Sequence, residues 1–239
     1  MLIHGLFGSL DNLAMLRRPL EQNFQILSVD LPDHGKSIFT ETFSYQHYAQ
    51  LLIDVTDDLS ISKISLVGHS MGGKVAMKMA LEYPDRIDKL VMLDIAPVAY
   101  SPRHNKVFEG LSQVKLGTLR DRRQADDILS QTIDEPGVRQ FLLKSLYKDE
   151  KGWQWRFNLE LLQRDYSLLS EQITSSKPSE HPTLFIKAEL SDYLKAEYRP
   201  AVLTLFPKSV SKVVGGTGHW LHAEKPAICA RMITDFLLA

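Results

Sequence analysis

The chain has 239 residues, of which 44% are hydrophobic and 24% are charged. This composition is typical of a globular domain and lacks the low hydrophobicity of disordered proteins. The 28 basic and 29 acidic residues give a net charge of -1, which offers no general attraction for nucleic acid or an anionic membrane. No apolar run approaches the roughly 18 residues of a membrane span. We therefore expect a cytoplasmic protein that binds no nucleic acid and inserts stably into no membrane.

Apolar runs of strand length alternate with amphipathic helical segments toward both ends of the chain. That alternation predicts an α/β fold with a mainly parallel central sheet flanked by helices. The expected strands cover residues 2–4, 25–30, 63–67, 88–94, 183–187 and 209–214.

Two helices are expected between and after these strands. Ser44 is a suitable N-cap for the first helix, and the last helix starts near Pro226, whose ring presets the backbone for a first helical position. Cys229 lies within the apolar pattern of the last helix and has no second cysteine to pair with, so we expect it to be buried. The apolar stripes proposed to face the core are Tyr48, Leu52, Val55 and Leu59 in the first helix, and Ile228, Met232 and Phe236 in the last.

Residues 97–178 interrupt the alternation, because they show helical patterns but no convincing strand. This segment leaves the sheet after one strand and returns before another, which places it over the carboxyl edge where open α/β sheets bind ligands. We therefore expect a core of residues 1–96 and 179–239 with a helical cap insertion at 97–178. The alternative is a helical decoration that does not contact the substrate.

The pentapeptide Gly68-His69-Ser70-Met71-Gly72 directly follows the apolar run 64–67 and directly precedes a helix-forming stretch, 74–82. G-x-S-x-G in this context is typical of a nucleophile elbow, a sharp strand-to-helix turn that projects a serine above the sheet edge. Glycines flank the serine because the turn is too tight for larger neighbours. Ser70 is therefore the candidate nucleophile.

A serine hydroxyl requires an adjacent base, and the chain order in such folds is serine, acid, histidine. His219 follows the last expected strand and a glycine-rich loop, 215–218, so we expect it to be the general base. Two positions could supply the acid that orients it. We favour Asp94, at the end of strand 88–94, with Ser191 as a supporting hydroxyl. Asp192, after strand 183–187, is the alternative acid.

The chemistry also needs two backbone donors for the oxyanion, one after the nucleophile and one in the loop after an early strand. Met71 fits the first position, and Leu6, between glycines at 5 and 8, fits the second. No cluster of His, Cys or carboxylate residues has metal-ligand spacing. We therefore expect no metal and no organic cofactor.

Several motifs together resemble a recognisable group, the YbfF-type bacterial esterases of the α/β-hydrolase superfamily. The resemblance covers essentially the whole chain and is carried by residues 4–13, 68–74, 93–98, 155–158 and 218–220. It implies an α/β-hydrolase fold with a small helical cap, and the roles assigned above to Ser70, His219, Asp94 and Ser191. It also implies further strands ahead of residues 2–4, so the first strands of the family are expected to be missing from this sheet.

The resemblance further implies hydrolysis of carboxylic esters of short to medium acyl chains, with acyl-CoA thioesters as an additional class. The expected partner is thus a small-molecule substrate, an acyl ester or thioester, which reacts through an acyl-enzyme on Ser70. The sequence does not predict the oligomeric state. Alternatives are a lyase or a carbon–carbon bond hydrolase on the same fold, or a ligand-binding protein without turnover. The cap aromatics are expected to line an acyl pocket or to pack the cap core: Phe108, Phe141, Tyr147, Trp153, Trp155 and Phe157.

Overall fold

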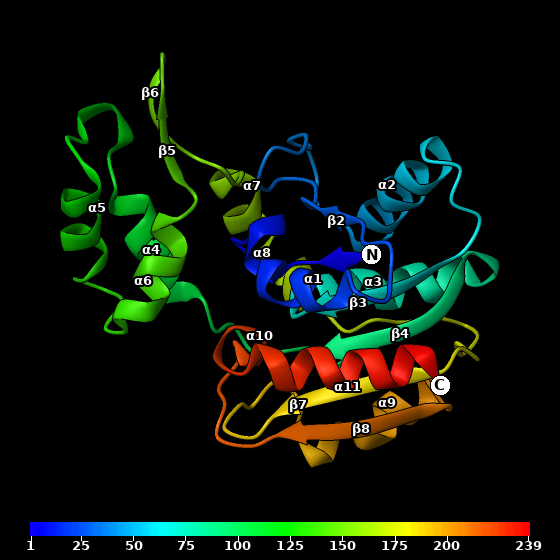
Figure 1. Cartoon of the computed structure of the whole chain (residues 1–239). Helices are drawn as coiled ribbons and strands as arrows, with labels where there is room; N and C mark the ends of the chain where they lie inside the picture. The colour runs from blue at the N-terminus through cyan, green and yellow to red at the C-terminus, as the bar shows by residue number, and fades with distance from the viewer.

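A computed structural model describes residues 1–239, and its centre is a six-stranded parallel sheet (Figure 1). The strand order is β2-β1-β3-β4-β7-β8, and each neighbouring pair runs in parallel. Every expected strand is confirmed, although the first two are shorter than predicted. The strands are β1 (Leu2–Ile3), β2 (Ser28–Val29), β3 (Ile64–His69), β4 (Ile87–Leu93), β7 (Thr183–Ala188) and β8 (Ser209–Val214).

Both faces of this sheet are buried, which explains why its strands are continuous apolar runs. Along β4, Leu90 and Met92 pack into one apolar cluster, whereas Val91 and Leu93 pack into a second cluster on the opposite face. The second cluster is closed by α1 (Ala14–Leu20), α10 (Leu221–Glu224) and α11 (Pro226–Leu238). The first is closed by α2 (Tyr45–Asp58), α3 (Met71–Glu82) and α9 (Arg199–Leu205).

The two predicted helices are present, but their buried stripes differ in part from the prediction. Ser44 caps α2 by accepting a hydrogen bond from the His47 N–H at 3.0 Å. The predicted stripe is wrong at Leu59, which is 54% exposed because α2 ends at Asp58. In α11 the predicted stripe is wrong at Ile228, which is exposed. Met232 and Phe236 are partly buried and pack against the second cluster, beside the buried Cys229, Ala230 and Ile233. The burial of Cys229 is thus confirmed.

The segment between β4 and β7 contains helices, as expected, and also a β-hairpin that the sequence pattern did not predict. Strand β5 (Leu146–Asp149) pairs antiparallel with β6 (Gly152–Trp155). The expectation of no strand is wrong there because the hairpin is short and its exposed residues are polar. The helices are α4 (Asn105–Gln113), α5 (Arg122–Leu129), α6 (Pro136–Leu143), α7 (Leu159–Arg164) and α8 (Tyr166–Ser170).

Figure 1 shows α4, α5, α6 and the hairpin as a group beyond the carboxyl ends of the strands, while α7 and α8 lie nearer the sheet. This is the edge at which an open α/β sheet binds ligands. The arrangement supports the proposed cap, whose boundaries at 97 and 178 remain a prediction. No helix in the chain combines the length and apolar character needed to cross a bilayer.

Candidate active site

Ser70 lies at the sharp turn between β3 and α3. Its backbone has φ 53° and ψ −122°, a left-handed region that non-glycine residues rarely occupy. The turn is held by hydrogen bonds: the Ser70 N–H donates to the Leu93 carbonyl at 3.1 Å, and the Gly73 N–H donates to the Ser70 carbonyl at 2.8 Å. Strain of this kind persists where surrounding structure enforces it, and it is concentrated at functional sites.

The two glycines of the pentapeptide are required by close backbone contacts. A Cβ atom at Gly68 would lie 2.5 Å from the Gly72 carbonyl oxygen, and one at Gly72 would lie 2.3 Å from the His4 carbonyl oxygen. Such distances are far inside van der Waals contact, so neither position accepts a side chain without movement of the backbone. The sharp strand-to-helix turn expected around Ser70 is therefore present, with the glycines at the positions where it needs them.

His219 follows β8 and meets Asp94 at the carboxyl end of β4. The His219 Nδ1 atom lies 2.7 Å from Asp94 Oδ2. The Asp94 side chain is fully buried, whereas that of His219 is 19% exposed. A buried carboxylate on Nδ1 fixes the tautomer in which Nε2 is free to accept a proton.

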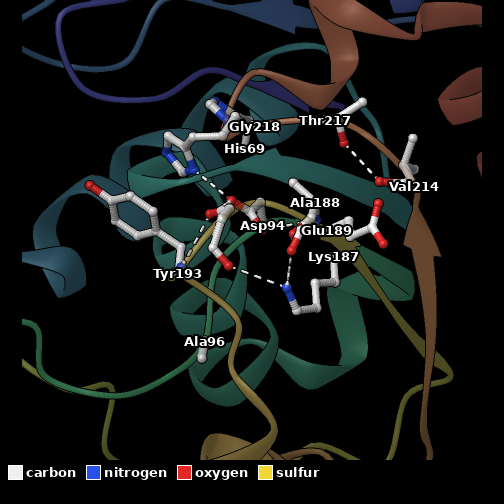
Figure 2. A network of polar contacts seen from close by, with 12 residues as sticks. His69, Asp94, Ala96, Lys187, Ala188, Glu189, Tyr193, Val214, Thr217 and Gly218 are labelled. Carbon is white, nitrogen blue, oxygen red and sulfur yellow. Dashed lines mark hydrogen bonds and ion pairs between the residues drawn. The ribbon is translucent and has the colours of Figure 1, made fainter.

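Asp94 is itself held by several groups around its carboxylate (Figure 2). Its Oδ1 accepts a hydrogen bond from the Ala188 N–H at 3.1 Å, and its Oδ2 accepts one from the Ser191 hydroxyl. The Asp94 backbone has φ 51°, and its N–H donates to the Ile186 carbonyl at 2.9 Å. These contacts aim the carboxylate from β4 across the end of β7.

Asp192, the alternative acid, has a different environment. Its side chain is 74% exposed, and its charged neighbour is Lys195 at 3.9 Å. The next residue, Tyr193, stacks on the His219 imidazole with ring centroids 3.9 Å apart. The loop after β7 therefore brings Ser191 and Tyr193 to the histidine and leaves Asp192 in solvent.

The two expected oxyanion donors lie beside Ser70. Neither the Leu6 N–H nor the Met71 N–H donates a hydrogen bond to another protein group. Leu6 and Ser70 line the same cavities, and Met71 lines the smaller of them. Both residues thus border a cavity at Ser70, and their N–H groups have no protein acceptor.

A cavity of about 420 Å³ contains Ser70 and His219 and extends under the cap segment. Its volume lies within the range of small-molecule sites. Of the cap aromatics, only Phe141 lines it; Phe108, Trp155 and Phe157 are buried, and Tyr147 and Trp153 are partly buried in the cap. Most of these aromatics therefore pack the cap rather than the pocket.

Buried histidines surround the His219 loop. The His69 Nε2 atom lies 2.9 Å from the His219 carbonyl oxygen, and the His69 ring centroid is 4.3 Å from that of His222. Burial lowers the pKa of His222 to about 3 and lowers the pKa of His69 as well. Both rings are therefore neutral at pH 7. His222 is only 3% exposed and lines the cavity.

Sequence reasoning missed Asp33, a fully buried carboxylate that joins the core to the cap segment. It accepts hydrogen bonds from Tyr48 Oη at 2.6 Å, from Thr40 Oγ1 at 2.6 Å and from Asn158 Nδ2 at 2.8 Å. This contact gives a structural reason for the motif at 155–158. The available signal is the turn sequence 31–35, in which an aspartate precedes a glycine by two positions.

Residues 1–226 match a family described as the α/β hydrolase fold, and the chain belongs to that family. It is 42% identical to Esterase YbfF of Escherichia coli K12, over 99% of this chain and 92% of that protein. It is 34% identical to the sn-1-specific diacylglycerol lipase ABHD11 of Mus musculus, over 98% of this chain and 79% of that protein. A solved marine microorganism esterase superposes with a TM-score of 0.96 at 32% identity, covering 98% and 93% of the two chains.

Proposed function

We propose that this protein is a serine esterase that cleaves carboxylic esters of short to medium acyl chains, and acyl-CoA thioesters, through an acyl-enzyme on Ser70. The observation that carries the proposal is the position of His219. It is hydrogen-bonded to the buried Asp94 and lines the same cavity as Ser70, which stands on a strained elbow. The names of the relatives, an esterase and a lipase, support the same reaction class.

In the proposed reaction, Ser70 Oγ attacks the acyl carbonyl carbon while His219 Nε2 takes the hydroxyl proton. The Leu6 and Met71 N–H groups stabilise the negative charge that develops on the carbonyl oxygen. His219 then gives its proton to the leaving alcohol or thiol, and the C–O or C–S bond breaks. Water, deprotonated by the same imidazole, releases the acid and restores Ser70. Asp94 stabilises the imidazolium that forms during both acylation and deacylation.

The test is initial-rate hydrolysis of p-nitrophenyl esters from acetate to octanoate, together with release of thiol from butanoyl-CoA. Ser70→Ala should abolish turnover, because loss of the nucleophile costs about 10⁶-fold in kcat in a comparable enzyme. Ser112→Ala, on the surface helix α4, is the matched control and should retain activity. A folded wild-type protein that cleaves no ester and no thioester would overturn the proposal in favour of a lyase or a binding protein.

A further inference from the structure

Two cavities of very different size meet at Ser70. The large one, of about 420 Å³, includes Phe141, His219 and Trp220. The small one, of about 40 Å³, also borders Ser70 and includes Met71 and Lys74. An ester bound at Ser70 has two parts, and the two cavities give each part a separate place.

The position of the base decides which part enters which cavity. His219 lines the large cavity and is absent from the lining of the small one, whereas Met71 lines only the small one. The protonated base must reach the leaving oxygen or sulfur in order to expel it. The leaving group therefore lies in the large cavity, and the acyl group points away from His219, past the Met71 N–H.

We propose that the small chamber is the acyl subsite, and that Lys74 forms its end wall and limits the length of the acyl chain. This inference rests on the proposed esterase function and narrows it. The large cavity then accommodates the alcohol or thiol part, for which it has room under the cap.

Lys74 is suited to be a fixed wall. It lies one turn beyond Ser70 in α3 and is only 1% exposed. Its ammonium group donates a hydrogen bond to the Glu171 carbonyl and lies 4.9 Å from the Tyr100 ring centroid and 5.7 Å from that of Tyr45. A buried ammonium held by a carbonyl and two aromatic faces has little freedom to swing aside.

The volume of the chamber sets the size of the acyl group. A water-sized group needs roughly 10–15 Å³ on this measure, so the 40 Å³ chamber holds about three such groups. With the reacting carbonyl carbon at Ser70, this corresponds to acyl groups from acetyl to about butanoyl. Longer chains that run toward Lys74 and Leu169, both of which line the chamber, would have to displace these side chains.

The experiment compares kcat/KM for p-nitrophenyl acetate, butanoate, hexanoate and octanoate, because the leaving group then stays constant. We expect the wild type to lose at least about tenfold from butanoate to octanoate, since a misfit methylene costs about 10-fold or more in kcat/KM. Lys74→Ala should raise the octanoate-to-butanoate ratio about tenfold, whereas Lys74→Met, which retains the length of the side chain, should leave the ratio near its wild-type value.

Leu169→Ala opens a second wall of the same chamber and should shift the ratio in the same direction, which keeps the test decisive if Lys74→Ala fails to fold. Phe141→Ala, in the large cavity, should change the rates on all four esters by one common factor. Equal rates of wild type on butanoate and octanoate would overturn the inference, as would a ratio that responds to Phe141→Ala but not to the chamber variants. Absence of any ester hydrolysis would instead refute the proposed function.

Discussion

Asp94 accepts the hydrogen bond of His219 Nδ1 at 2.7 Å from the end of β4, although the two residues are 125 positions apart in the chain. The carboxylate that contacts the histidine thus comes from the end of β4, the strand that follows α3, and the loop after β7 contributes the Ser191 hydroxyl.

Asp94→Asn is expected to lower kcat on p-nitrophenyl butanoate by about 10⁴-fold, because an amide in that position favours the wrong imidazole tautomer. Asp192→Asn is the matched control and should change kcat less than about twofold, since its side chain is 74% exposed. Initial rates of both variants, with circular dichroism to verify folding, provide the measurement. The reverse pattern would assign the acid to the loop after β7.

Ser191→Ala is expected to reduce kcat by roughly 10- to 100-fold, because a hydrogen bond to a charged group contributes about 1.5–3 kcal/mol. The Ser191 hydroxyl donates to Asp94 and also accepts the Tyr193 N–H at 3.2 Å. Ser191→Thr retains the hydroxyl and should restore most of the activity, with KM unchanged in both variants. An alanine variant as active as wild type would show that the hydroxyl is dispensable.

Gly72→Ala is expected to abolish activity and to reduce the yield of folded protein, because its Cβ would lie 2.3 Å from the His4 carbonyl oxygen. Gly137→Ala is the matched control: it lies in α6, and a Cβ added there would meet no atom within 4 Å. That control should raise stability by about 0.4–1 kcal/mol. Thermal unfolding of the two variants tests the contrast, and equal melting temperatures would contradict it.

Acid should destabilise the fold from about pH 6.5 downward. Burial lowers the pKa of His222 to about 3 from 6.5, and burial likewise lowers the pKa of His4 to about 3. Because the folded-state pKa lies below the unfolded value, the unfolded chain binds more protons between these two pH values. Stability is therefore complete above about pH 6.5 and declines toward about pH 3, by about 1.4 kcal/mol per pH unit for each such histidine.

Urea unfolding of His222→Phe between about pH 7 and about pH 4 measures this slope. The variant removes one titrating group whose Nδ1 atom has no hydrogen-bond partner, so its stability should fall less steeply with acid than that of wild type. His47→Phe, at an exposed position in α2, is the control and should keep the wild-type slope. Equal slopes for all three proteins would contradict the assignment to His222.

The sheet could be predicted from sequence because burial on both faces makes each parallel strand a continuous apolar run. The β5–β6 hairpin could not be predicted, since its strands are short and show no clear alternation of apolar and polar residues. The prediction for α11 is wrong at Ile228 because Ile228 and Cys229 are both apolar, and only packing against the sheet shows which of them is buried.

The candidate site likewise has parts that a local sequence pattern predicts and parts that it does not. Ser70 and the flanking glycines are local features of one turn, so the sequence pattern is sufficient to find them. The roles of Lys74 and Asp33 could not be predicted in this way, because they depend on partners distant in sequence, Glu171 for the first and Asn158 for the second. The turn around Asp33 predicts a bend in the chain but not the contact with the cap. Chain order alone could not decide between the two candidate acids, since that depends on which carboxylate points inward.

The contact of both Ser191 and His219 with the same oxygen of Asp94 means that two neighbouring strand ends converge on one point in space. His219 therefore needs a carboxylate at that point, and either strand end is close enough to supply it. A carboxylate could migrate between those strand ends in evolution, in two substitutions, while the imidazole, the elbow and the cavity stayed where they are.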